Sequence, residues 1–129
     1  MAKPLEITTR DLEDIQAQGF ELRGYLDAGA VPAFDEGVTW QVVKGEGTVV
    51  IFMENLEYVS SAGIGALMGL DRQLREQGGK LILFRPPGRV RKIFDMLGLT
   101  RILKVADSTE QMAEMAGVRP SADGNDGRR

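Results

Sequence analysis

Residues 48–70 read TVVIFMENLEYVSSAGIGALMGL and change from a strand pattern to a helix pattern within one short joint. Residues 49–53 are apolar and rich in β-branched side chains, which is typical of a strand buried on both faces. From Ile64 onward the apolar residues recur at helical spacing, and this helix pattern ends near Gly78. We therefore predict a buried strand, a tight joint and an amphipathic helix.

The joint itself reads Ser60-Ser61-Ala62-Gly63. A serine hydroxyl at the start of a helix accepts a hydrogen bond from an otherwise unpaired backbone N–H, so either Ser60 or Ser61 is expected to be the N-cap. The partial positive charge at the amino terminus of a helix also favours an anion, and a phosphate group is stabilised there. We expect the functional site at this joint.

The rest of the chain alternates between strand and helix patterns. Strand patterns cover 5–9, 15–22, 80–84 and 102–105, helix patterns cover 31–42, 90–97 and 108–116, and turns are expected at 24–27, 45–47 and 86–88. This alternation predicts an α/β sandwich with a four- to five-stranded mixed sheet, in which crossovers make the later strands parallel and helices pack mainly on one face. The predicted core places Val49, Ile51 and Met53 opposite Ile64, Leu67 and Met68.

Composition narrows the possible function classes. The chain has 129 residues, so we expect one domain at 1–117, followed by a disordered polar tail at 118–129. A net charge of −3 argues against nucleic-acid binding. No apolar run reaches the roughly 20 residues of a membrane span, and the first residues lack a signal-peptide layout. We therefore expect a cytoplasmic protein with no membrane partner.

The residue types also limit catalysis. The sequence contains no histidine and no cysteine, which removes the commonest general base, common metal ligands and thiolate chemistry. A small hydrolase using Ser61 would lack a base, so we expect no catalytic residue, no metal and no cofactor. The run Gly63-Ile64-Gly65 departs from the spacing of a dinucleotide fingerprint, and tight packing explains these glycines better.

Four other large side chains invite a functional interpretation. Met96, Met112 and Met115 fall at helical core positions, and we expect them to pack in the core and not to form a partner groove. The single tryptophan, Trp40, lies near the end of the helix pattern at 31–42, which contains Gly37. The sequence leaves open whether Trp40 is a core residue or an exposed anchor.

Four segments resemble the STAS domain family, which includes bacterial anti-sigma factor antagonists and the cytoplasmic tails of sulfate transporters. They are 55–67, which contains the joint, 23–27, which reads RGYLD, 78–81, which reads GGKL, and 93–99, which reads IFDMLGL. The resemblance extends over residues 5 to 116, and it implies a STAS-type sandwich.

In stand-alone family members the joint typically reads Asp-Ser-Ser/Thr-Gly-Leu-Gly, and an anti-sigma factor that is also a serine kinase phosphorylates its first serine. Aligning the glycines makes Ser61 the phosphoacceptor that the resemblance implies. Ser60 then stands where the family usually has aspartate, and Ala62 stands where it has a second hydroxyl. The partner-binding residues implied by the resemblance are Asp27, Ser60, Ser61 and Gly63.

The resemblance implies an anti-sigma factor antagonist that acts as a protein-interaction switch. Unphosphorylated at Ser61, it would bind an anti-sigma serine kinase of the GHKL ATPase type and so free a sigma factor, and phosphorylation would end the binding. A serine phosphatase of the PP2C type is the second implied partner. The alternative is a scaffold STAS subunit of a transporter or of a stressosome-like assembly without a phosphoswitch, which the exchange of aspartate for Ser60 favours.

Overall fold

The structure is a computed structural model that describes residues 3–42 and 47–117. Its strands are β1 (Glu6–Leu12), β2 (Ala17–Leu26), β3 (Thr48–Val59), β4 (Lys80–Phe84) and β5 (Lys104–Ala106). Its α-helices are α1 (Val31–Phe34), α2 (Ser61–Glu76), α3 (Gly88–Met96) and α4 (Thr109–Ala116). Shorter 3-10 or π segments are η1 (Glu13–Ile15), η2 (Ala28–Ala30), η3 (Asp35–Thr39) and η4 (Leu99–Arg101). The predicted tail at 118–129, and all of the predicted turn at 45–47 except Gly47, lie outside the described residues.

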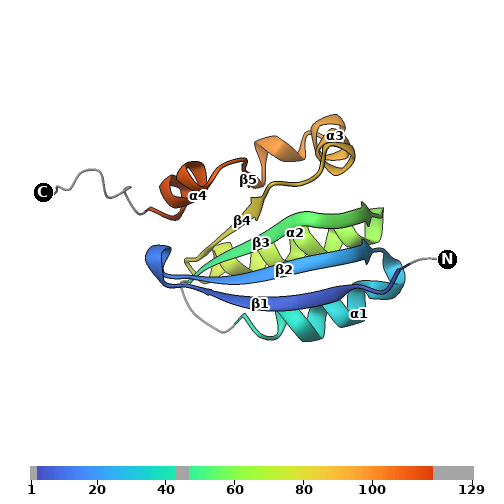
Figure 1. The fold of residues 1–129 in the computed structure, drawn as a ribbon, viewed down its shortest axis with the longest axis horizontal. Helices are drawn as coiled ribbons and strands as arrows, with labels where there is room; N and C mark the ends of the chain where they lie inside the picture. The colour runs from blue at the N-terminus through green and yellow to red at the C-terminus, as the bar shows by residue number, and fades with distance from the viewer. Residues whose placement is uncertain (1–2, 43–46, 118–129) are drawn as a thin grey trace, which may run out of the picture.

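The five strands form one sheet whose spatial order, β1-β2-β3-β4-β5, is the order of the chain (Figure 1). β1 and β2 are antiparallel neighbours, and η1 lies in the turn between them. β2, β3, β4 and β5 are parallel, and the connections between them contain α1, α2 and α3 in turn. The predicted mixed α/β sheet with parallel later strands is therefore confirmed.

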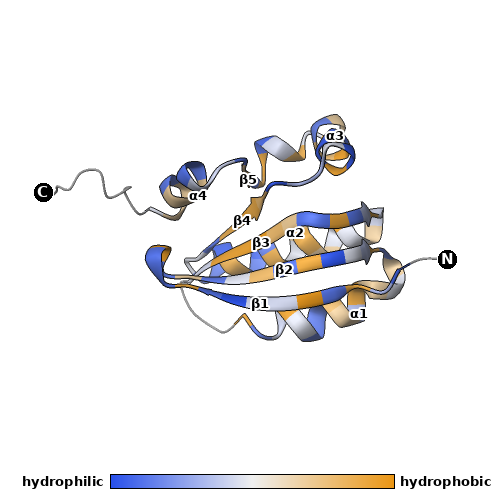
Figure 2. Cartoon of the chain, viewed as in Figure 1, coloured by the Kyte–Doolittle hydropathy of each residue, from blue (hydrophilic) through white to orange (hydrophobic). Residues whose placement is uncertain are grey.

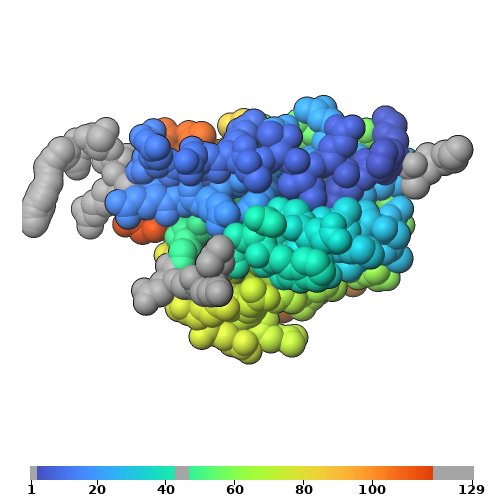
Figure 3. Space-filling model, turned by 90° about the horizontal axis from the view of Figure 1, so that it is seen from below, coloured from blue at the N-terminus to red at the C-terminus, as the bar shows by residue number. Residues whose placement is uncertain are grey.

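The two faces of the sheet are covered differently. Val49, Ile51 and Met53 of β3 lie in the main core with side chains of α1, α2 and α3, whereas Val50 and Phe52 lie in a second core with α4. Viewed from below, α1 and η3 lie between β1 and α2, so this segment closes the main core at the β1 edge (Figure 3). The prediction that helices pack mainly on one face is confirmed.

The inward face of α2 differs from the prediction at one position. Ile64 and Leu67 are buried in the main core as predicted, but Met68 is only half-buried and packs at the margin of that core. Leu70 and Leu74 are buried instead. They continue the three- to four-residue spacing from Leu67, whereas Met68 lies one step around the helix from it.

Strand β2 is longer than the sequence predicts. It continues through Gly24 to Leu26, and the predicted turn at 24–27 begins only at Asp27. Gly24 has a φ of 102° and lies next to a shift in the register between β2 and β3. A bulge inside a strand uses the same glycine as a turn, so the two patterns are alike in the sequence.

Other element boundaries also shift. The predicted strand at 15–22 begins at Ala17, because Ile15 belongs to η1. The predicted strand at 102–105 begins at Lys104, since Ile102 ends the turn formed by η4. The predicted helix at 31–42 is α1 followed by the π segment η3, and Trp40 at its end is 68% exposed. Trp40 is therefore not a core residue.

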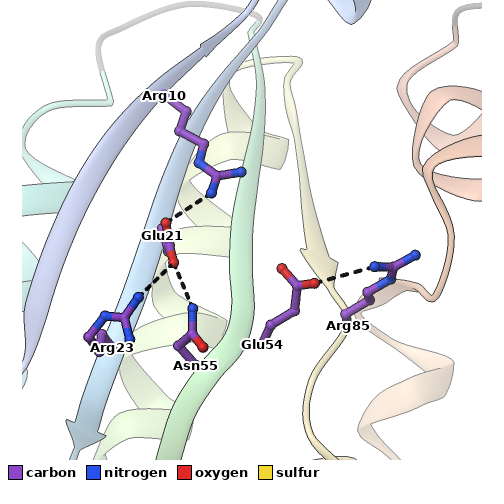
Figure 4. Close-up of polar contacts among 6 residues, drawn as sticks. All are labelled: Arg10, Glu21, Arg23, Glu54, Asn55 and Arg85. Atoms are coloured by element: carbon purple, nitrogen blue, oxygen red, sulfur yellow. Dashed lines mark hydrogen bonds and ion pairs between the residues drawn. The ribbon is translucent and has the colours of Figure 1, made fainter.

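β3 also continues beyond Met53 to Val59, and its second half contains both hydrophilic and hydrophobic residues (Figure 2). On the second face, polar contacts lie over this part of the sheet (Figure 4). The Glu21 carboxylate accepts hydrogen bonds from Arg10 Nη2 at 3.0 Å, Asn55 Nδ2 at 2.7 Å and Arg23 Nη2 at 3.5 Å. The Arg10 guanidinium also lies 4.6 Å from the centre of the Phe52 ring. Glu21 therefore joins β1, β2 and β3 by their side chains.

Replacing Glu21 tests whether this network stabilises the sheet. Glu21→Ala should lower the free energy of unfolding by about 1–2 kcal/mol, because three donors lose the acceptor that they share. Glu54→Ala is the matched control, since Glu54 makes one exposed ion pair, with Arg85 at 3.3 Å, and should change stability by less than about 0.5 kcal/mol. Urea unfolding measures both variants, and equal losses would contradict the central role of Glu21.

Candidate functional site

Two strand ends lie side by side at one edge of the sheet. Leu26 at the end of β2 pairs with Val59 at the end of β3. The Ser60 backbone N–H donates a hydrogen bond to the Leu26 carbonyl oxygen at 3.0 Å, which ties the start of the next helix to β2. Asp27 and Ser60 therefore follow neighbouring strand ends. The carboxyl edge of a parallel sheet is where α/β proteins usually place their binding sites.

Ser60 is the N-cap of α2. Its backbone is extended, with φ −95° and ψ 175°, and its Oγ accepts a hydrogen bond from the Gly63 backbone N–H at 3.2 Å. Serine and aspartate are about equally good N-caps, because each offers a side-chain oxygen to this N–H. An aspartate at position 60 could therefore form the same cap as Ser60.

Ser61 is the first residue of α2, and its side chain is exposed. Among the residues that the structure describes, its hydroxyl makes no hydrogen bond, whereas the hydroxyl of Ser60 is half-buried and bonded. Ala62, the next residue, is also exposed and adds little bulk. The structure thus resolves the alternative between the two serines: Ser60 caps the helix, and Ser61 presents a hydroxyl at its amino terminus.

Gly63 fixes the position of these serines. It is buried, and a Cβ atom at this residue would overlap the carbonyl oxygen of Leu26 and lie 2.9 Å from Leu26 Cγ and 3.0 Å from Val59 Cγ2. The first turn of α2 can approach β2 this closely only because Gly63 has no side chain. The structure therefore gives Gly63 a packing function, and direct contact with a partner stays a prediction.

Asp27 begins the turn on the neighbouring strand end. Its Oδ1 accepts a hydrogen bond from the Ala30 backbone N–H at 3.1 Å, and this bond caps η2. The side chain is half-buried, and Ala28 and Gly29 beside it are exposed. Asp27 therefore shapes this turn while keeping part of its carboxylate at the same edge as Ser60.

Two tyrosines that the sequence did not single out lie at this edge. Tyr25 and Tyr58 pair across β2 and β3, and their ring centres are 5.5 Å apart at an angle of 45°. Tyr58 is exposed and only two residues before Ser60. These tyrosines could have been identified from the sequence, because they lie at the ends of the two strands that lead into the predicted site. Exposed tyrosines are common at protein interfaces.

The site offers an exposed hydroxyl, a carboxylate and aromatic rings, but the hydroxyl has no base within hydrogen-bond distance among the described residues. In residues 3–42 and 47–117, no three His, Cys, Asp or Glu side chains gather where they could hold a metal ion. None of the helices there is long and apolar enough to cross a membrane.

Comparison with known proteins identifies the family. The family model named STAS domain matches residues 9–112, a range that contains the joint at Ser60 and Ser61 and four of the five strands completely. The chain belongs to the STAS domain family. The resemblance seen in the sequence is therefore confirmed, and the fold is that of a STAS domain.

The sequence relatives are named anti-sigma factor antagonists. The anti-sigma F factor antagonist of Lysinibacillus sphaericus is 32% identical over 110 residues, which cover 84% of this chain and 88% of that protein. An anti-sigma factor antagonist from Mycobacterium paratuberculosis has a similar structure, with a TM-score of 0.74 at 17% identity over 90% of this chain and 97% of that one. SpoIIAA, a Bacillus anti-sigma factor antagonist solved in unphosphorylated and phosphorylated forms, gives a TM-score of 0.58 at 24% identity, over 85% of this chain and at least 96% of its own. The similar solved structures also include a sulfate transporter family protein from Wolinella succinogenes, with a TM-score of 0.64 at 16% identity over 77% of this chain and 83% of that one.

The close approach at Gly63 generates a sharp test. Gly63→Ala should destabilise the protein by more than about 2 kcal/mol, because the new methyl group must push α2 away from β2. Gly65→Ala lies two residues later in the same helix, where nothing lies within 4 Å of a Cβ atom, and should stabilise by about 0.5–1 kcal/mol. Thermal unfolding measures both variants. Equal effects of the two substitutions would show that the contact between Gly63 and Leu26 does not hold the joint.

Proposed function

We propose that this STAS domain is an anti-sigma factor antagonist controlled by phosphorylation of Ser61. The observation that carries the proposal is the difference between two adjacent serines, since Ser60 Oγ is engaged by the Gly63 N–H and the Ser61 hydroxyl is exposed. The name of the L. sphaericus relative and the phosphorylated form of SpoIIAA support the same function. Such a function belongs in the cytoplasm.

In the proposed reaction, an anti-sigma factor of the GHKL ATPase type supplies ATP and the general base. The Ser61 oxygen forms a bond to the γ-phosphorus, the bond between that phosphorus and ADP breaks, and the hydroxyl proton passes to the kinase. A serine phosphatase of the PP2C type returns the free hydroxyl by hydrolysis. This assignment leaves the chain itself without a catalytic residue, in keeping with a hydroxyl that has no base bonded to it.

The phosphate acts on the interface more than on the fold. It adds about −1.5 to −2 charges at the first residue of α2, a 16-residue helix whose amino terminus carries partial positive charge. The helix therefore stabilises the modified form. A partner that packs closely over Ser61 must instead bury this charge, and an unpaired buried charge costs several kcal/mol, which is about a hundredfold or more in affinity.

The proposed contact surface for the unphosphorylated form is the edge formed by the ends of β2 and β3. Ser61 lies at its centre, Asp27 lies on the adjacent turn, and Ser60 and Gly63 hold the two turns together. The Asp27 carboxylate is also a fixed negative charge close to the modification site. A partner surface that is complementary to Asp27 before Ser61 is phosphorylated faces an excess of negative charge after the phosphorylation.

Phosphorylation assays on serine variants test this proposal. With the cognate anti-sigma kinase and ATP, Ser61→Ala should not be phosphorylated, because the acceptor oxygen is gone. Ser60→Ala should remain a substrate although it loses about 1 kcal/mol of stability, since it removes only the cap. Mass-spectrometric mapping identifies the site. Modification of Ser61→Ala at the rate of the parent would refute the assignment.

Calorimetric titration of the same kinase with ADP present tests the effect of charge. Ser61→Asp should bind at least about thirtyfold more weakly than its neutral match Ser61→Asn. Asp27→Asn should also weaken binding while keeping the turn, because asparagine caps as well as aspartate. Equal affinities of Ser61→Asp and Ser61→Asn would contradict a phosphorylation switch and favour the scaffold function.

A further inference from the structure

Three large apolar side chains are exposed on one corner of the molecule that the serine site does not include. Met96 is 78% exposed, Leu97 is 60% exposed and Ile102 is 53% exposed. The prediction that Met96 packs in the core is wrong, whereas Met112 is buried and Met115 packs against the second core as predicted. Met96 lies about 200° around α3 from the buried Phe94, so it points away from the sheet.

The backbone holds this corner in a defined shape. α3 ends at Met96, Leu97 is its C-cap, and Gly98 has a φ of 73°, which turns the chain into η4. The Leu97 N–H donates to the Ile93 carbonyl at 3.1 Å, and the Ile102 N–H donates to the Leu99 carbonyl at 3.0 Å. The exposed side chains therefore belong to a hydrogen-bonded turn on the β5 side of the sheet, at the opposite end of the strand order from β1 (Figure 1).

The segment that carries these apolar residues is rich in cations. Residues 88–104 contain five Lys and Arg residues and one acidic residue, Asp95, although the whole chain has a net charge of −3. One of the five, Arg91, is paired with Asp107 at 2.8 Å. The other four are exposed and take part in no ion pair within residues 3–42 and 47–117: Arg89, Lys92, Arg101 and Lys104. The corner is thus basic on an acidic protein.

We propose that the corner formed by residues 96–102 is a second docking surface, which binds an acidic helical segment of a partner protein through apolar side chains on one face of that segment. The apolar residues supply the buried contact, and the exposed cations of α3 and η4, which are Arg89, Lys92 and Arg101, pair with carboxylates around it. A protein segment fits better than an anionic membrane, because only Met96, Leu97 and Ile102 form the apolar part of this corner and they lie around a turn. A helix that lies in a membrane interface instead buries one continuous apolar face. The surface does not depend on the state of Ser61.

The test uses the isotope-labelled full chain and a synthetic helical peptide of about 18 residues, with leucine along one face and glutamate elsewhere. Backbone NMR shifts should map binding to residues 93–104, with a Kd of about 100 μM at low salt. Raising NaCl from about 0.05 to about 0.5 M should weaken binding by about fivefold or more. The same peptide with lysine in place of glutamate should not bind.

Variants locate the contact. The double variant Met96→Ser/Leu97→Ser and the variant Arg101→Glu should each lower affinity about tenfold. Their matched controls are Trp40→Ser, which removes an exposed apolar side chain just after η3, and Arg72→Glu, which reverses an exposed charge on α2. Both controls and Ser61→Asp should bind as the parent does, which separates this surface from the serine site.

Several results would overturn the proposal. They are equal binding of the glutamate and lysine peptides, no binding of either peptide, parent affinity in the Met96→Ser/Leu97→Ser variant, or shifts confined to the serine edge. Binding of the corner to phosphatidylglycerol vesicles but not to the peptide would assign it to membranes. Backbone NMR shifts at residues 93–104 that change with protein concentration in the absence of peptide would show that this corner binds a second copy of the chain.

Discussion

The contact between the end of β2 and the first turn of α2 is the constraint on which the site depends. The Leu26 carbonyl oxygen accepts the Ser60 N–H at 3.0 Å and occupies the space that a Cβ atom of residue 63 would need. One oxygen atom thus sets both the direction in which the chain leaves β3 and the distance of α2 from the sheet. Because Leu26 directly precedes Asp27, the same contact brings the two turns of the site together.

This constraint gives Ser60 and Ser61 different functions. The residue that follows β3 must cap α2, since its backbone is already fixed by Leu26, and Ser60 does so through Gly63. The next residue then starts the helix with its side chain exposed. Any good cap at position 60 leaves residue 61 in this place, so exchanging the family's aspartate for serine preserves the geometry. A modification at Ser61 can therefore change the surface without breaking the joint.

Much of this architecture could be predicted from local patterns. The apolar run at 49–53 and the helical spacing from Ile64 are strong periodic signals, and both elements occur where they were expected. The identity of the cap could not be derived, because both serines are adjacent and only the backbone path from Leu26 decides between them. The bulge at Gly24 looked like a turn, since both use the same glycine.

Exposure was harder to predict than secondary structure. Methionine is an apolar residue that is often buried in a core. Met96 is nevertheless exposed to solvent, because it lies on the opposite side of α3 from the buried Phe94. The second half of β3 lies outside the predicted strand at 49–53. It has fewer apolar residues than the first half, and its Asn55 bonds to Glu21 on β2. Such side-chain networks join distant segments and leave no periodic signal in the sequence.

The most direct test of the central claim is release of a sigma factor from its complex with the anti-sigma kinase. The complex would be titrated with the unmodified chain and with the chain phosphorylated at Ser61, while the free sigma factor is measured by fluorescence anisotropy. The unmodified chain should release the sigma factor, and the phosphorylated chain should need a concentration about a hundredfold or more higher for the same release. Equal release by the two forms would contradict a switch at Ser61.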